Sequence, residues 1–390
     1  MSYGIRRILL LVISYLKFTY YSIIRIFIYN QPKQSSARSL LLVKLDEIGD
    51  YILFRNLLKY FKTSETYKYH SIDFCGNKVW KALFDTFDES LIDSTCWISK
   101  RKFSQNLSYR TKVLKSISNK NYDVVINCSI SRNYFIDDEI VRSTNSHEKI
   151  GSNSDFSNQF NWQLRKSNNY YSKLVQINPC LVFEFHRNKN FISNILGVDI
   201  EEILPSIQVK PSSNEILLKS KYVAFSLGAK NKYKIWDTRN FIKVANYIID
   251  TFNFNIVLLG SDADKKYTEE FKNSMNRENI FDFVSKTSLI SAINFINNSE
   301  FVISNDSGLA HIAAALNKRV VVIANGTHLG RFFPYPTSDK VKVFYPPLIQ
   351  ERIIDFDELQ IKYKYRSNLN INDISAKDII DYLQSNFHKN

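Results

Sequence analysis

The chain has 390 residues, 44% of them hydrophobic and 14% aromatic, which is enough for two domains with real cores and excludes disorder throughout. Its formal net charge of +14 indicates an anionic partner: nucleic acid, acidic lipid or a phosphorylated substrate. Nucleic acid is the weakest of the three, because no zinc-ligand spacing occurs and the aromatic residues are scattered. The widely spaced cysteines (Cys75, Cys96, Cys128 and Cys180) are typical of reduced thiols in a cytosolic protein.

The first 30 residues form a basic and apolar segment. Arg6, Arg7, Lys17 and Arg25 lie among aliphatic and aromatic residues, and on a helix they fall within about 100° of arc. The longest uncharged run is far shorter than the ~20 residues needed to cross a bilayer. The segment therefore predicts either a helix in the interface of an acidic membrane or a helix packed on the protein's own surface. A polar linker is expected over 31–39.

The first strand is expected over 39–45, and residues 46–50 turn from it into a helix expected over 51–62. A strand that ends in a Gly-containing turn at a helix start suits an anionic ligand. Asp50 would lie at the carboxyl edge of this strand, where a carboxylate can take a proton from an incoming hydroxyl as a general base. The alternative is an acidic residue in the first helical turn, favoured there by the helix dipole.

Strands and helices alternate along the rest of the first half, which predicts a parallel sheet with crossover helices. The expected elements are a short strand near 71–74, a helix from Lys78, a helix over 105–118 and a strand over 123–128. Residues 129–180 show no pattern beyond loops and short pieces. His186 is expected on a surface helix, and the stretch over 205–214, rich in Pro and Ser, predicts the connection between two domains.

The second half repeats the alternation and predicts a Rossmann-like domain, whose ligand belongs at the carboxyl ends of the strands. Strands are expected over 222–226, 255–259, 281–284, 301–304 and 320–324, and helices over 238–252, from 264, over 289–298, after residue 307 and over 374–387. Three loops fall on the ligand edge: Leu227 to Lys234, Gly260 with Ser261, and Asn305 to Gly308.

The stretch from Phe301 to Leu316 is the most specific of these. Its strand stops at Asp306 and Ser307 and restarts as a helix whose first N–H groups suit a phosphate. One helix face is small and carries His311, which suits close approach of a ligand. The alternative is an ordinary capped helix, with Asp306 or Ser307 as the N-cap and a satisfied core histidine.

Two cations accompany this stretch. Lys234 is able to place a point charge on a diphosphate, and Arg331, in a stiff loop over 325–336 rich in Gly, Pro and aromatics, is able to reach an anion. The alternatives are a solvated lysine and a packed surface loop.

Two motifs carry a resemblance to a known family. The stretch from Asn305 to Leu316 (Asn-Asp-Ser-Gly-Leu-Ala-His-Ile-Ala-Ala-Ala-Leu) resembles the donor-site motif of the family-9 glycosyltransferases, which include the bacterial lipopolysaccharide heptosyltransferases. The stretch from Val43 to Asp50 (Val-Lys-Leu-Asp-Glu-Ile-Gly-Asp) resembles the family's first motif, whose final Asp is its candidate catalytic base. Asp46 and Glu47 replace the small hydroxyl residues found in many members. Weaker matches keep the same order from about residue 40 to 340.

The resemblance implies an α/β GT-B architecture, with two Rossmann-like domains facing a cleft. The expected parts are a basic amphipathic extension and linker (1–38), an acceptor domain (39–210), a nucleotide-sugar domain (211–345) and a segment whose helix packs back on the first domain (346–390). The implied reaction is inverting transfer of a sugar from a nucleotide diphosphate sugar, ADP-heptose-like, to a hydroxyl of a lipopolysaccharide or other surface glycan. Neither a metal nor another cofactor is expected.

The resemblance also implies the site residues. Asp50 would deprotonate the acceptor. The expected donor-binding residues are Gly228, Ala229, Lys234, Gly260, Asp306, Ser307, Gly308, Leu309, His311 and Arg331. The expected location is the cytoplasm, peripheral on the inner face of the cytoplasmic membrane, which residues 1–30 would contact. The alternatives are a non-catalytic nucleotide-sugar or membrane-binding module and, less favoured because no Gly-x-Gly-x-x-Gly follows a strand, a Rossmann-type redox enzyme.

Overall fold

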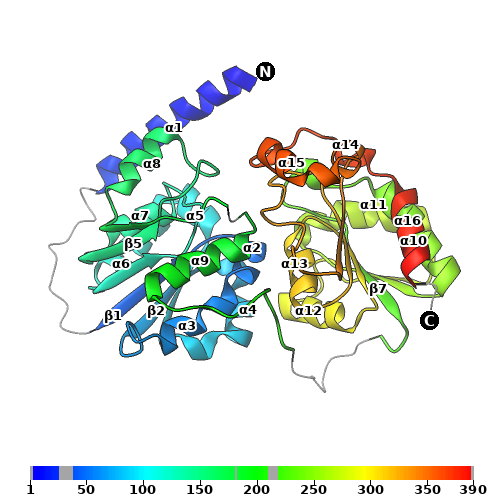
Figure 1. Cartoon of the computed structure of the whole chain (residues 1–390), viewed down its shortest axis with the longest axis horizontal. Coiled ribbons are helices and arrows are strands. Elements are labelled where there is room, and N and C mark those ends of the chain that lie inside the picture. The colour runs from blue at the N-terminus through cyan, green and yellow to red at the C-terminus, as the bar shows by residue number, and fades with distance from the viewer. Residues whose placement is uncertain (1–2, 26–37, 181, 210–217, 388–390) are drawn as a thin grey trace. The chain divides into compact units, whose positions relative to one another are not determined.

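A computed structural model of the chain describes residues 3–25, 38–180, 182–209 and 218–387 (Figure 1). These divide into two units. The first comprises Met1–Glu47, Leu57–Pro179 and Arg187–Ile200, and the second comprises Ile48–Asn56, Cys180–His186 and Glu201–Asn390. The expected linker over 31–39 and the expected connection over 205–214 fall largely on residues 26–37 and 210–217, which lie outside the described residues.

The first unit is built on a parallel six-stranded sheet in the order β3-β2-β1-β4-β5-β6. Its strands are β1 (Ser39–Lys44), β2 (Ser71–Asn77), β3 (Ser94–Ile98), β4 (Val124–Asn127), β5 (Glu148–Ser152) and β6 (Lys173–Val175). The central strands β1 and β4 are almost continuous apolar runs because helices cover both faces of a parallel sheet. The strand order is that of doubly wound folds, and it reverses between β1 and β4.

The helices of the first unit differ from the expectation in two places. The helix expected over 105–118 begins at Leu107, because the side chain of Asn106 accepts from the backbone of Tyr109 and caps it, and a separate helix over Lys100–Gln105 precedes it. The region without a sequence pattern, 129–180, contains two strands and two helices. The helices are α1 (Tyr3–Arg25), α3 (Lys59–Thr63), α4 (Lys81–Phe87), α5 (Lys100–Gln105), α6 (Leu107–Ser118), α7 (Asp137–Ser143), α8 (Asn161–Asn168) and most of α9 (Glu184–Leu196).

Aromatic side chains fix helix α1 to the first unit. Tyr15 stacks on Trp162 with ring centroids 4.5 Å apart. Tyr21 lies 3.9 Å below the Arg110 guanidinium and donates its hydroxyl to the carbonyl of Ser104. The helix nevertheless exposes large apolar side chains, namely Ile8, Leu9, Leu10, Val12, Ile13, Leu16 and Tyr20. Of the helices in the described ranges, none combines the length and apolar character that crossing a bilayer requires.

The second unit has its own parallel six-stranded sheet, in the order β12-β11-β10-β7-β8-β9. Its strands are β7 (Tyr222–Ser226), β8 (Asn255–Leu258), β9 (Ile280–Asp282), β10 (Val302–Asn305), β11 (Val320–Ile323) and β12 (Val341–Phe344). β12 was not expected from the sequence. The order is again doubly wound, with its reversal between β7 and β10, so the predicted Rossmann-like sheet is confirmed in both halves.

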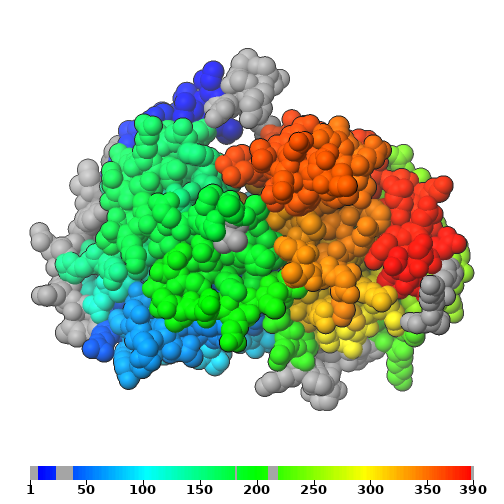
Figure 2. Space-filling model, in the orientation of Figure 1, coloured from blue at the N-terminus to red at the C-terminus, as the bar shows by residue number. Residues whose placement is uncertain are grey.

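The C-terminal helix is fixed within the second unit. Its residues Ile379 and Leu383 enter the core of that unit beside Val244 and Ile248 of α10, and its expected packing on the first domain stays a prediction. Its apolar face completes the layer over this sheet. The helices are α2 (Ile48–Ile52), α10 (Thr238–Phe252), α11 (Lys265–Met275), α12 (Leu289–Asn298), α13 (Gly308–Ala315), α14 (Pro347–Gln350), α15 (Phe356–Tyr363) and α16 (Ala376–Phe387). Figure 2 shows the C-terminal residues, orange to red, as a continuous part of this unit's surface.

Candidate active site

The loops that follow β7 and β10 meet where the order of the second sheet reverses. The Asn305 side chain joins them, since its amide donates to the carbonyl of Leu227 (2.8 Å) and its oxygen accepts from the backbone of Trp236 (3.1 Å). Between these contacts, Lys234 Nζ lies 2.6 Å from Asp306 Oδ2. The structure therefore pairs the lysine expected at the diphosphate with the carboxylate expected at the sugar.

Helix α13 begins directly after this pair. Ser307 occupies its N-cap position with extended backbone, but its side chain makes no capping hydrogen bond and instead contacts the Ser304 hydroxyl at 3.0 Å. Asp306 lies outside the helix, so an Asp306 cap is not observed. The first N–H groups of an α-helix have no acceptor within the helix. Those of Gly308 and Leu309, both half-buried, therefore have no acceptor within the helix, and their contact with a phosphate stays a prediction.

Helix α2, which carries Asp50 in its first turn, packs against the start of α13. A Cβ atom on Gly308 would lie 3.1 Å from the Ile48 Cβ, and one on Gly49 would lie 2.6 Å from Cδ2 of His311. A side chain at Gly49 would collide with the ring, and one at Gly308 would require Ile48 to move by a few tenths of an ångström. Because adjacent Cα atoms are about 3.8 Å apart, the Cα of Asp50 lies within about 8 Å of the His311 ring. The predicted base and the predicted donor helix are thus neighbours within one unit.

The His311 imidazole is enclosed. Its Nδ1 lies 2.9 Å from the Tyr335 hydroxyl, and its ring stacks on Phe333 with centroids 4.4 Å apart. Burial lowers the pKa of His311 to about 4, so the ring is neutral at pH 7. The small helix face expected to be open to a ligand is covered here, because Gly49 allows the α2 backbone against the ring. Direct contact between His311 and a donor stays a prediction.

The two glycines expected at the donor edge pack on one carboxylate. Cβ atoms on Gly228 and Gly260 would lie 1.8 Å and 2.9 Å from carboxylate oxygens of Asp264. That carboxylate accepts from the backbone N–H and hydroxyl of Ser261. Close packing against Asp264 thus explains why both positions are glycine. Ala229, which follows Gly228, is half-buried. Their contact with a donor remains a prediction.

Arg331 has a partner that the sequence did not reveal. Its Nε donates to Glu184 Oε2 at 2.8 Å, and its carbonyl accepts from the Glu184 backbone. Both side chains are largely buried. The guanidinium expected to reach an anion is therefore neutralised by a carboxylate 147 residues away in the chain.

The loop over 325–336 is held at several points. The Thr327 hydroxyl accepts from the Ser367 backbone, and the His328 ring contacts the Lys364 carbonyl at 3.1 Å. Gly326 has φ near +86°, and a side chain there would collide with Ile349. The stiffness expected of this loop is therefore observed, and the C-terminal segment supplies much of it.

The first sheet also gathers charges at its carboxyl edge. Lys44, fully buried, pairs with Asp46 at 2.9 Å, and Lys100 pairs with Glu47 at 3.0 Å. Burial by itself would raise the pKa of Asp46. The positive charges of Lys44 and Lys100 have the larger combined effect, so the pKa of Asp46 is lowered. Burial, reinforced by Asp46, raises the pKa of Asp137 to about 8. Asp46 and Glu47 thus form ion pairs where many relatives are expected to have hydroxyls.

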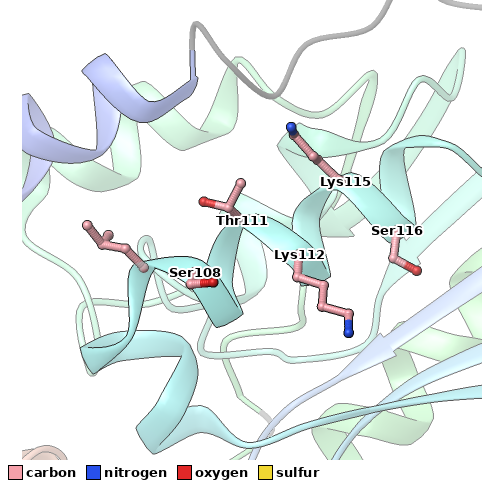
Figure 3. A pocket seen from close by; sticks show the side chains of 6 residues that line it. Ser108, Thr111, Lys112, Lys115 and Ser116 are labelled. Carbon is pink, nitrogen blue, oxygen red and sulfur yellow. The ribbon is translucent and has the colours of Figure 1, made fainter.

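Two cavities of the first unit differ in what lines them. One of about 410 Å³ lies at this charged edge and is lined by Glu47, Asn77, Lys78, Val79, Ser99, Lys100 and Arg101. The other, of about 670 Å³, runs along the single helix α6, from which Thr111, Lys112 and Lys115 project (Figure 3). The first cavity lies where a doubly wound sheet places its ligand, and the second does not.

The comparisons with known proteins concern the sequence and the fold. The sequence model of glycosyltransferase family 9 (heptosyltransferase) matches residues 110–349, more than half of the chain. The lipooligosaccharide heptosyltransferase 2 of Haemophilus influenzae is 30% identical over 195 residues, which cover 46% of this chain and 54% of that protein. The match thus spans about half the length of that relative.

Solved structures share the fold at low sequence identity. The family-9 glycosyl transferase of Veillonella parvula superimposes with a TM-score of 0.67 at 16% identity, over 89% of this chain and 96% of that one. The E. coli heptosyltransferase WaaC, solved with ADP, gives a TM-score of 0.65 at 15% identity, over 89% and 99%. The fold and the match to the sequence model confirm what the two motifs predicted: the chain belongs to glycosyltransferase family 9, the heptosyltransferase family.

Proposed function

We propose that the chain is an inverting glycosyltransferase that moves a sugar from a nucleotide diphosphate sugar, ADP-heptose-like, to a hydroxyl of a lipopolysaccharide or other surface glycan. One observation carries the proposal: the helix bearing Asp50 packs on the start of α13, within the same unit. A carboxylate and a phosphate-binding helix start are thus close enough to act on the two sides of one sugar carbon. The relatives named as heptosyltransferases, one of them solved with ADP, support this class of donor.

In the proposed reaction, an acceptor oxygen attacks the anomeric carbon from the face opposite the diphosphate. Asp50 takes the proton from that oxygen as the new C–O bond forms. The old bond to the diphosphate breaks, and its electron pair leaves with the phosphate. The N–H groups of Gly308 and Leu309 stabilise the departing charge, assisted by Lys234. Asp306, released from part of its pairing with Lys234, holds sugar hydroxyls.

The acceptor is proposed to bind the first unit, in the cavity of about 410 Å³ at its carboxyl edge. Glu47 lines this cavity and precedes Asp50 by three residues in the chain. Lys78, Lys100 and Arg101 give the cavity a positive lining, which suits an acidic glycan.

Attachment to the inner face of the cytoplasmic membrane is proposed for residues 1–30. Aromatic contacts fix α1 to the first unit, and its exposed apolar side chains remain available to enter a bilayer interface. The basic residues of the segment suit anionic headgroups.

Replacement of Asp50 by Asn tests the transfer chemistry. The amide keeps the size of the side chain but cannot accept a proton, so Asp50→Asn should lose transfer by at least about 10²-fold while its affinity for the donor is unchanged. Asp250→Asn, which removes an exposed carboxylate paired with Arg277 in the same unit, is the control.

A non-catalytic nucleotide-sugar or membrane-binding module is the alternative. Such a module would bind the donor equally well with Asn at position 50 and would show no transfer in the unsubstituted protein. Full transfer by the Asp50→Asn variant would also contradict the proposed chemistry.

A further inference from the structure

Three strand ends of the second sheet place polar residues in a row. Asp306 follows β10, Asn325 follows β11 by one residue, and Tyr345 follows β12 directly. The strands are in register, since the backbone of Asp306 donates to Ile323 and that of Ala324 donates to Phe344. The row therefore extends from the Lys234–Asp306 pair toward the edge of the sheet.

Two members of this row have buried atoms without a hydrogen-bond partner among the described residues: Nδ2 of Asn325 and the hydroxyl of Tyr345. The two side chains are 1% and 5% exposed. The Asn325 side chain is oriented, because its Oδ1 accepts from the backbone of Thr327 and Nδ2 must then point the other way. Buried polar groups are nearly always paired, so these two mark the place of a partner from outside the chain.

His328, three residues after Asn325 in the chain, adds an acceptor. Its Nδ1 contacts the carbonyl of Lys364, which only accepts, so Nδ1 carries the proton and Nε2 carries the lone pair. Burial, with the positive charge of Arg331, lowers the pKa of His328 to about 4, which keeps the ring neutral. Lys234 and Asp306 both act electrostatically on this ring, which places it near their ion pair.

We propose that Asn325, His328 and Tyr345 form the sugar-recognition end of the donor site, next to the Lys234–Asp306 pair. The assignment rests on the proposed transfer function. The amide donates, the imidazole Nε2 accepts and the phenol does both, which matches a polyhydroxylated sugar. None of the three carries a positive charge that would pair with a carboxylate, so the sugar is a neutral one and not a uronic acid.

The geometry sets a condition on binding. The unpaired atoms of Asn325 and Tyr345 lie below the surface, so side chains over them move when the sugar enters. The loop itself is fixed by its contacts with Ser367 and Lys364, so this movement is confined to side chains.

Two substitutions each remove one hydrogen-bonding group, and the second also removes the edge-to-face contact of the His328 ring with Phe332. Tyr345→Phe deletes only the unpaired hydroxyl. His328→Asn retains a donor at the position of Nδ1, tolerates the left-handed backbone of this residue (φ near +57°) and deletes Nε2. Tyr222→Phe is the control, because its buried hydroxyl donates to the Phe295 carbonyl in the core of the same unit.

The measurement compares the Kd of ADP with that of ADP-heptose, by calorimetry, for each protein. Tyr345→Phe and His328→Asn should each weaken ADP-heptose binding about three- to tenfold and leave ADP binding unchanged. Tyr345→Phe should keep or raise the melting temperature, whereas Tyr222→Phe should lower it without altering either Kd. An unchanged ADP-heptose affinity in both variants overturns the inference alone and assigns the unpaired atoms to structural water. Failure of the unsubstituted chain to bind ADP-heptose or another nucleotide sugar overturns the proposed transfer together with it.

Discussion

The packing of α2 on α13 predicts that even one methyl group at Gly49 is harmful. A Cβ there would lie 2.6 Å from Cδ2 of His311, roughly 1 Å inside the ~3.5–4.0 Å at which carbon atoms attract. The ring cannot turn aside, because Tyr335 contacts its Nδ1 and Phe333 stacks on its face. Gly49→Ala must therefore push α2 away from α13 by about the size of the overlap.

The free energy of unfolding follows from two opposing terms. Overpacking of this kind costs about 1–3 kcal/mol. Replacement of Gly by Ala in a helix returns about 0.4–1 kcal/mol, because the unfolded chain has less freedom. The expected net loss is about 1–2 kcal/mol. The accompanying shift of Asp50 by about 1 Å should lower the rate of transfer about 100-fold.

A double-mutant cycle with His311→Ala isolates the contact. Urea unfolding of the four proteins should show that Gly49→Ala costs free energy in the presence of the ring and almost none in its absence. An equal cost in both backgrounds, or a Gly49→Ala protein of full stability and activity, would refute the packing that places Asp50 beside the donor helix.

Two further predictions concern charge at the same site. The pKa of His311 is about 4 in the folded chain and about 6.5 in the unfolded chain, so only the unfolded chain takes up this proton between those pH values. The free energy of unfolding should therefore fall by up to about 3 kcal/mol as the pH drops from 6.5 to 4. In pH-dependent urea unfolding, this fall should be smaller for His311→Asn and unchanged for the exposed control His147→Asn. Lys234→Ala removes the partner of Asp306 and should destabilise the protein by about 2 kcal/mol or more. In thermal melts, the double variant Lys234→Ala with Asp306→Asn should recover most of that loss, while donor binding stays weak in both variants. Equal stability of the single and the double variant would contradict a strong ion pair.

The sequence predicted the fold where burial leaves a clear pattern. The central strands β1, β4, β7, β10 and β11 are short apolar runs between turn residues, as strands buried on both faces must be. The strands without a prediction include the sheet-edge strands β3, β6 and β12, which are short or partly polar. The helix expected over 51–62 is interrupted in the structure. Most of its residues are buried, so the sequence has no alternation of polar and apolar positions from which the interruptions could have been predicted.

The candidate site was predictable only where its residues are neighbours in the chain. The motif from Asp306 to His311 could be recognised from the sequence because the end of a strand and the start of a helix lie in one short stretch. The pairing of Lys234 with Asp306 joins residues 72 apart, and that of Arg331 with Glu184 joins residues 147 apart. The residues next to each partner in the sequence give no sign of these ion pairs. The pairs depend on the order of the strands in the sheet, which the spacing of apolar residues along the chain does not reveal.

These internal pairs bear on how a chain of net charge +14 holds a diphosphate. The two side-chain cations proposed for the donor, Lys234 and Arg331, are each within 2.8 Å of a carboxylate, so their charge is largely cancelled before a donor arrives. Backbone N–H groups at the start of α13 are fixed in direction and have no counter-ion to give up. The affinity for phosphate is therefore expected to arise from this preorganised helix start rather than from the excess of basic residues. That excess lies instead on the cavity at the carboxyl edge of the first sheet, on α6 and in the N-terminal segment, where large anionic partners rather than a small donor would meet it.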